Sequence, residues 1–217
     1  PQKGAVVMTL TTQGDVPIHY TLDGSEPTAA SPRYTGPVEI GKSARFRATA
    51  LREGGENASY SREFAFSKST GRPAVLNTKP NDSYTFEGAS LLVDGYHSRP
   101  VFTSGAWLGY LDEPLDVTID MGGEQSYRSV ELETLAEKGD WIFPPSSVTV
   151  WVSDNGTDFT EVASVAVPDG IGRYRMQFPE TSARYLKVVA QNAAAIPAWH
   201  PGAGSKGFLF VDEVVVE

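Results

Sequence analysis

The sequence predicts an all-β protein that consists of two antiparallel β-sandwiches. Apolar and polar residues alternate with a period of two in many segments, as at Ile18, Tyr20 and Leu22, and this pattern is typical of strands with one buried face. Asp-Gly and Asn-Gly pairs, which favour tight turns, separate such segments. No window of helical length keeps a 3.6-residue apolar period. We therefore expect about five strands before residue 68 and about eight after it.

The alternation assigns the strands in order along the chain. Buried faces are predicted at Ile18, Tyr20 and Leu22, then at Phe46, Ala48 and Ala50, whose neighbours Arg45, Arg47 and Thr49 should face solvent. The later faces are Leu115, Val117, Ile119 and Met121, then Val148, Val150 and Val152, then Tyr174, Met176 and Phe178. Turns are predicted at Asp23-Gly24, Asp94-Gly95, Asn155-Gly156 and Asp169-Gly170.

Two domains are predicted, at residues 1–67 and 68–217. The polar segment 68–73, which ends in Pro73, has the composition of a short linker. Residues 1–67 carry seven basic and seven acidic residues, whereas residues 68–217 carry eleven and twenty. The two parts differ in charge and share no repeat, so we expect two unlike sandwiches.

Composition excludes several classes of protein. The formal charge of −9 argues against a nucleic-acid partner, and the apolar runs are too short for a membrane-spanning helix. Without cysteine there is no disulfide and no thiolate metal site. The chain begins at Pro1 and shows no signal segment, so we expect an excised fragment or a processed form.

Catalytic motifs are weak. Glycoside hydrolysis uses two carboxyl groups that flank one bond, and Asp212-Glu213 is an adjacent pair in a terminal strand. Neighbours on a strand point to opposite faces, so we expect one of them in a surface or metal role and the other in solvent. His19, His97 and His200 are scattered, no Gly-x-Ser-x-Gly elbow is present, and His19 should face solvent.

Two loops have the composition of a sugar-binding site. Segments 138–145 and 192–207 place Trp141 and Trp199 among glycine, proline and charged residues. Exposed flat rings cover the C–H face of a sugar, and charged groups bind its hydroxyls. The alternative is that both tryptophans cap the end of the sandwich as packing. We assign Trp151 to a mid-strand packing role and Trp107 to the core.

The segment 92–98 contains a tight turn at Asp94-Gly95. Calcium takes oxygen ligands from such turns and from one or two carboxylates. A plain Asp-Gly turn without an ion is the alternative.

The first part resembles a known small domain. Its motif is Tyr20-Thr21-Leu22-Asp23-Gly24-Ser25-Glu26-Pro27-Thr28, followed by Ser31, Tyr34 and Pro37. It is similar to the domain C-terminal to the catalytic barrel in bacterial chitobiases and β-N-acetylhexosaminidases. The resemblance implies an immunoglobulin-like or fibronectin III-like sandwich.

The second part resembles the coagulation factor 5/8 type C, or discoidin, domain. The resemblance rests on segments 92–95, 107–110, 117–122, 153–156, 184–188, 199–204 and 210–213. It implies a larger jelly roll with calcium at Asp94 and Glu213, although Tyr96 stands where a small amide is common. It also implies carbohydrate contacts from loops at one end, which here hold Trp141, Trp199, His200, Asp140, Lys206 and Arg99.

Together the resemblances imply a non-catalytic accessory fragment of a periplasmic or secreted glycoside hydrolase that acts on N-acetylhexosaminides. Its partners would be an amino sugar or galactose-type glycan and a catalytic domain outside this chain, because a (β/α)₈ barrel needs about 250 residues. Phe210-Val211 precedes Asp212-Glu213, where the hexosaminidase motif has other residues. A purely structural module that packs on the barrel is the main alternative, and a lone enzyme is the third.

Overall fold

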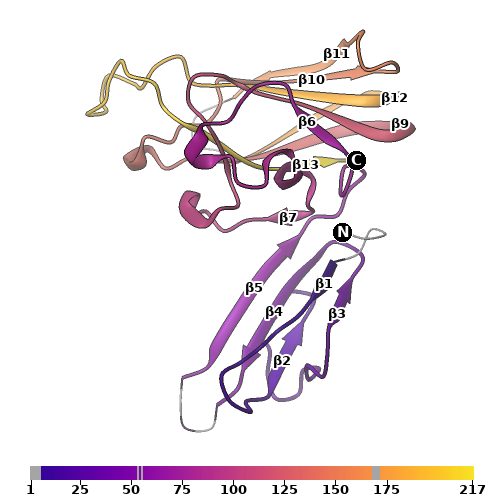
Figure 1. The fold of residues 1–217 in the computed structure, drawn as a ribbon, viewed down its shortest axis with the longest axis vertical. Coiled ribbons are helices and arrows are strands. Elements are labelled where there is room, and N and C mark those ends of the chain that lie inside the picture. The colour runs from indigo at the N-terminus through magenta and orange to yellow at the C-terminus, as the bar shows by residue number, and fades with distance from the viewer. Residues whose placement is uncertain (1–5, 53, 55, 168–171) are drawn as a thin grey trace. The chain divides into compact units, whose positions relative to one another are not determined.

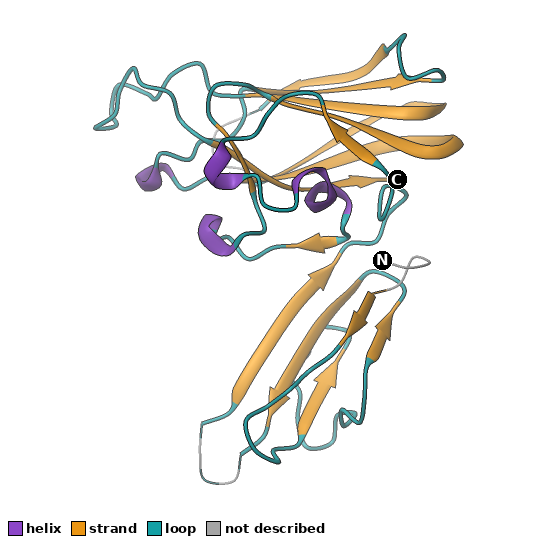
Figure 2. Ribbon diagram, in the orientation of Figure 1, coloured by secondary structure: helices purple, strands orange, loops and turns teal. Residues whose placement is uncertain are grey.

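The computed structural model describes residues 6–52, 54, 56–167 and 172–217, and the predicted Asp169-Gly170 turn lies outside them. The chain separates into two compact units, Pro1–Phe66 and Ser67–Glu217. In the described residues the ribbon consists of strands, loops and short 3₁₀ turns (Figures 1 and 2). The all-β fold class is therefore confirmed. None of the described helices is long and apolar enough to cross a membrane.

The first unit contains two small antiparallel sheets. Strand β1 (Val6–Met8) pairs with β3 (Val38–Ile40). Strand β4 (Ala44–Ala50) lies between β2 (Ile18–Thr21) and β5 (Ala58–Phe64) and pairs antiparallel with both.

Phe46 is the centre of the core of this unit. Its side chain is fully buried, and its ring stacks on Tyr20 at a centroid distance of 5.8 Å and meets Tyr60 at 6.4 Å. Two residues that the sequence pattern places in solvent are not fully exposed in the structure. Thr49 is buried on β4, and His19 is half-buried because its Nδ1 lies 2.7 Å from the carbonyl oxygen of Ser31.

The second unit is one large antiparallel sheet arranged in the order β11-β10-β12-β9-β13-β8, with β6 paired to β9 as well. The strands of this sheet are β6 (Ala74–Leu76), β8 (Leu108–Tyr110), β9 (Leu115–Leu135), β10 (Ser147–Ser153), β11 (Thr160–Ala166), β12 (Arg173–Gln191) and β13 (Leu209–Val216). The unit also contains the two-residue strand β7 (Tyr96–His97), which is not part of this sheet. The 3₁₀ turns are η2 (Asp82–Tyr84), η3 (Gly88–Val93), η4 (Phe102–Ser104) and η5 (Lys138–Asp140).

Strands β9 and β12 are far longer than the sequence pattern indicates. Their pairing register shifts between Gln177 and Thr181 and again between Ala183 and Tyr185, and such irregularities let paired strands bend. On β9, Gly122 takes a positive φ of 79°, which glycine adopts without steric cost. The alternation is interrupted at these bends, so the sequence shows only the straight parts of each strand.

The core of the second unit has two parts. The main cluster contains the predicted β9 face, Leu115, Val117, Ile119 and Met121, together with the inward residues of β10, β12 and β13. A smaller cluster joins Trp107, Leu135, Ile142 and Phe210, so the assignment of Trp107 to the core is confirmed.

We predict that Phe46→Ala lowers the free energy of unfolding of the first unit by about 3–5 kcal/mol, because it leaves a cavity between two aromatic rings. Val7→Ala is the control: Val7 is 60% exposed, and its truncation should change stability by less than about 0.5 kcal/mol. Differential scanning calorimetry of both variants measures the difference. Equal effects would contradict the packing described.

Candidate functional site

Two loops meet at the beginning of β13. The loop after β9 and the loop after β12 are joined by a bridge between Ile142 and Phe208. The Phe208 N–H donates to the carbonyl oxygen of Trp141 at 2.8 Å, and the Phe143 N–H donates to that of Phe208 at 2.9 Å. These bonds fix the position of Trp141 on the rigid sheet.

The loop 192–207 is closed on itself. Ile196 is buried, and its N–H donates to the carbonyl oxygen of Ser205 at 2.8 Å, while the Gly204 N–H donates back to Ile196 at 3.0 Å. Asn192 donates from Nδ2 to the carbonyl oxygens of Tyr110 and Leu111 at 3.3 and 3.2 Å. A long loop with this many internal bonds loses little further freedom when it binds a ligand.

Trp141 and Trp199 present exposed indole surfaces, with 42% and 63% of their areas accessible. Trp141 has a left-handed backbone with φ of 63°, an unusual conformation for a bulky residue. Its N–H donates to the carbonyl oxygen of Lys138 at 3.1 Å and holds this geometry. We call the pair the aromatic platform.

His200 lies beneath the aromatic platform and is 6% exposed. Its ring meets Trp141, Trp199 and Phe143 edge-on, at centroid distances of 5.6, 5.5 and 5.6 Å. The Gly202 N–H donates to Nδ1 at 3.0 Å, and Nε2 lies 2.8 Å from the carbonyl oxygen of Lys138. A carbonyl only accepts, so the neutral Nε2–H tautomer satisfies both contacts. Both ring nitrogens thus have protein partners.

Gly202 packs closely against the Trp141 ring. A Cβ atom at this position would lie 2.6 Å from Cη2 of Trp141, which is closer than carbon atoms pack. Only glycine therefore lets the loop approach the indole at this distance.

Charged residues lie on the two loops that carry the aromatic platform. Lys138 holds its Nζ 5.7 Å from the centre of the Trp199 ring, Asp140 is exposed next to Trp141, and Lys206 pairs with Asp112 at 2.6 Å. Arg99 is exposed, and its carbonyl oxygen accepts a bond from Trp107, which packs with Ile142 beneath this end. Asp112 could not be identified from the sequence, because Lys206, with which it pairs, is 94 positions away along the chain.

A second group of polar residues lies under the turn 94–98. The Gly95 N–H donates to Oε1 of Glu213 at 3.3 Å, and the Tyr96 N–H donates to Oδ1 of Asp94 at 2.8 Å. Glu213 is fully buried, and its Oε2 has no hydrogen-bond partner. Burial, followed by the negative charge of Asp94, raises the pKa of Glu213 well above its usual range.

The expectation that Asp212 or Glu213 is solvated is wrong, because both are buried. The register between β13 and β9 shifts between Val211 and Val214. Val211 pairs with Thr134 and Val214 with Leu132, so two residues of β13 face only Glu133. This β-bulge lets consecutive carboxylates both meet the 94–98 segment.

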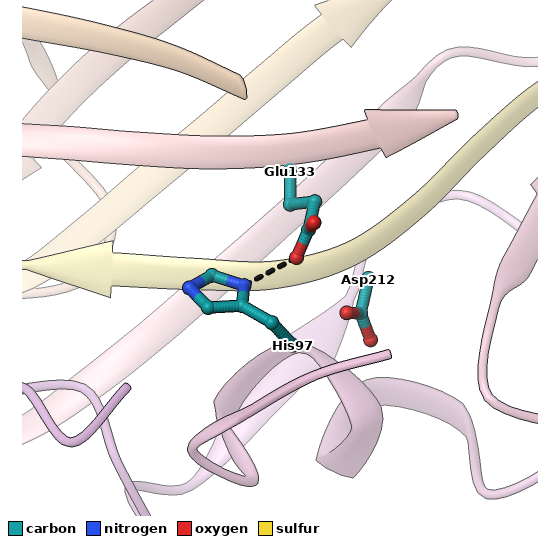
Figure 3. Close-up of side chains that lie close together, drawn as sticks. All are labelled: His97, Glu133 and Asp212. Carbon is teal, nitrogen blue, oxygen red and sulfur yellow. Dashed lines mark hydrogen bonds and ion pairs between the residues drawn. The ribbon is translucent and has the colours of Figure 1, made fainter. Parts of the chain in front are cut away.

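Asp212 belongs to a buried group with His97 and Glu133 that could hold a metal ion (Figure 3). One ligand atom from each residue lies within 4.8 Å of the others. His97 Nδ1 is hydrogen-bonded to Oε2 of Glu133, and Arg173 Nε donates to Oε1 of Glu133 at 3.0 Å. Glu133 could not be identified from the sequence, because in Val130-Glu131-Leu132-Glu133 it alternates with apolar residues as a solvated strand residue would.

The structure thus defines a chain of two unlike β-sandwich units, the second with aromatic rings on loops at one end. Residues 77–206 match the F5/8 type C domain, and residues 2–62 match the chitobiase/beta-hexosaminidase C-terminal domain. The chain belongs to the F5/8 type C domain family and carries the chitobiase/beta-hexosaminidase C-terminal domain before it. Both resemblances found in the sequence are confirmed.

Several solved structures are similar to the second unit at low identity. Chitosan-binding module 1 of a chitosanase/glucanase from Paenibacillus sp. IK-5 is 19% identical, with a TM-score of 0.48 over 70% of this chain and 98% of that one. CpGH89CBM32-5 from Clostridium perfringens, in complex with GalNAc-β-1,3-galactose, is 16% identical, with a TM-score of 0.47 over 66% and 93%.

A Ruminococcus gnavus GH29 fucosidase variant in complex with fucose is 12% identical, with a TM-score of 0.50 over 70% of this chain and 26% of that one. This likeness shows the fold. No curated protein matches the sequence.

We predict that Gly202→Ala displaces the Trp141 indole, because the new methyl group would occupy the space of the ring. The Nε1–H resonance of Trp141 should shift in a ¹H–¹⁵N NMR spectrum. Gly139→Ala is the control, since a Cβ there meets no atom within 4 Å. An unmoved Trp141 resonance in Gly202→Ala would contradict the close approach.

Proposed function

We propose that the second unit binds carbohydrate on the aromatic platform of Trp141 and Trp199. The observation that carries this proposal is the exposure of two indole rings that the loops and the buried His200 ring hold in place. Exposed apolar surface that is grouped in one place marks binding sites on proteins, and an aromatic ring offers a flat apolar face next to polar groups.

The chemistry of a pyranose fits such a surface. One face of the sugar ring presents C–H groups that pack on an indole, and its hydroxyls lie at the rim. Asp140 would accept bonds from hydroxyls, while Lys138 and Lys206 would donate to ring or acetamido oxygens. Because the surface is open, the affinity for one sugar should be modest. We infer an N-acetylhexosamine or galactose-type glycan as the ligand.

His200 enters this proposal as a support. Its two ring nitrogens bind Gly202 and Lys138, so it has no free nitrogen to offer to a hydroxyl. It would act by fixing both indoles before the sugar arrives. Arg99 would contribute only through its exposed side chain.

We infer further that the chain is an accessory, non-catalytic region of a periplasmic or secreted glycoside hydrolase that acts on N-acetylhexosaminides. The match of residues 2–62 to the chitobiase/beta-hexosaminidase C-terminal domain supports this context. Asp212 and Glu213 are buried beneath the 94–98 turn, where they do not flank an open cleft. Catalysis would therefore belong to a partner domain.

We propose that Asp94 and Glu213 hold a calcium ion. The residues fit this ion, because Glu213 Oε2 is a buried oxygen without a hydrogen-bond partner and the nearby Asp94 adds a second carboxylate. Bound calcium would neutralise the buried Glu213 and the half-buried Asp94 and fix the turn that follows η3. We therefore assign it a structural role.

We predict that Trp141→Ala and Trp199→Ala each weaken binding at least tenfold, a loss of about 1.4 kcal/mol, because each removes a stacking surface. Affinity electrophoresis and a glycan array with the whole chain provide the measurement. Trp151→Ala is the matched control, since Trp151 lies mid-strand on β10 with Lys187 Nζ 5.5 Å from its ring.

A folded chain that binds no glycan would favour the alternative, a structural module that packs against the catalytic domain. In that case both indoles should become inaccessible to a quencher in the full-length enzyme. If glycans bind but neither tryptophan matters, the site lies elsewhere on the unit.

We predict that calcium raises the melting temperature of the wild-type chain by roughly 5–10 °C at a hundredfold excess over Kd. Glu213→Gln should abolish this shift, because it removes the charge of the buried ligand. The exposed Asp82 pairs with Lys79, and Asp82→Asn should keep the full shift. Identical shifts in all three proteins would contradict the site.

A further inference from the structure

A second cation site is suggested by the three buried side chains of Figure 3. His97 comes from β7, Glu133 from β9 and Asp212 from β13, and they are 8%, 8% and 1% exposed. The β-bulge places Asp212 opposite Glu133 on the neighbouring strand. His97 reaches the pair because the 94–98 segment lies against β13, where the Ser98 N–H donates to Oδ2 of Asp212 at 2.7 Å.

The two carboxylates of this group have different partners. Glu133 is hydrogen-bonded to His97 and to Arg173, which is 40% exposed. Asp212 accepts hydrogen bonds from the N–H and the Oγ of Ser98. A buried carboxylate without a counter-charge is strongly disfavoured.

Asp212 and Glu133 lie opposite each other at the β-bulge, and two carboxylates in such a position repel each other when both are ionised. The region therefore favours either bound protons or a bound cation. Calcium at Asp94 and Glu213 would balance one pair of acids and leave Glu133 and Asp212 with His97.

The donor set distinguishes this group from the calcium site. Calcium prefers oxygen ligands alone, whereas one imidazole nitrogen with two carboxylates suits zinc and the divalent ions close to it in the first transition series. Ligand atoms around tetrahedral zinc lie about 3.3 Å apart. Atoms already within 4.8 Å of one another need only small side-chain rotations to reach that spacing.

Neighbouring residues hold the proposed ligands in place through hydrogen bonds, as the hydrogen-bond partners of metal ligands do in metal sites. Arg173 is the cross-strand neighbour of Glu133 and binds Oε1, which leaves Oε2 facing His97. Ser98 holds Asp212 through its N–H and its Oγ, at 2.7 and 3.2 Å. An ion would take the place of the proton between His97 Nδ1 and Glu133 Oε2.

We propose that His97, Glu133 and Asp212 form a binding site for a zinc-type divalent cation, separate from the calcium site at Asp94 and Glu213. The ion would tie β7, β9 and β13 together. The proposal does not depend on carbohydrate binding. Its alternative is a metal-free network in which His97 pairs with Glu133 and Asp212 keeps a proton.

The test is a titration of the whole chain with Co²⁺ in the presence of excess calcium, followed by visible absorption and calorimetry. We expect one Co²⁺ per chain, a visible d–d band typical of low coordination number, and displacement by Zn²⁺ but not by calcium. No band and no bound Co²⁺ in the folded wild-type chain would overturn the proposal and support the metal-free network.

His97→Asn is the main variant, because its amide can still donate to Glu133 while the imidazole ligand is lost. It should bind Co²⁺ at least tenfold more weakly. His19→Asn is the matched control: His19 is half-buried in the first unit, and its replacement should leave binding unchanged. Asp212→Asn tests the same site if His97→Asn does not fold. Unchanged Co²⁺ binding in a folded His97→Asn or Asp212→Asn chain would contradict the assignment.

Discussion

The β-bulge at Asp212 and Glu213 is the constraint on which much of the second unit depends. It sets two carboxylates of β13 opposite the single residue Glu133, and both are then covered by the 94–98 segment. Toward its beginning, the same strand pairs with β8 and with the end of β9. Just before it, Phe208 bridges to Ile142, which fixes the loop that carries Trp141. A change in the register of β13 would therefore disturb the acidic group and the aromatic platform together.

The aromatic platform is rigid because polar atoms beneath it are paired. His200 accepts from Gly202 and donates to Lys138, so the two loops are joined through one neutral ring. Each indole touches that ring edge-on, and Gly202 leaves room for Trp141 because it has no Cβ. An open surface gains little contact area with a small ligand, so a low ordering cost is what makes binding feasible there.

The strands could be predicted from the sequence because one-face burial leaves a period of two. The loops with exposed tryptophans could also be predicted, since Trp141 and Trp199 stand among glycine and proline. The buried acids could not. Glu133 alternates like a solvated residue, and only its distant partners His97 and Arg173 explain its burial. The bends of β9 and β12 cannot be predicted from the sequence, because the alternation of apolar and polar residues stops where the pairing register shifts.

The buried acids of β13 also define its register. A slip by one residue would bring either Val211 against the Ser98 N–H or Val214 against the Gly95 N–H, and leave that donor without its acceptor. Each unsatisfied buried donor costs about 1–3 kcal/mol, so the slipped pairings are disfavoured even though valine suits a strand. The acids stabilise one pairing at the cost of burying charge, and bound cations would reduce that cost. On this argument, cation binding and correct strand pairing favour each other, because the ligands come together only when β7, β9 and β13 are in register.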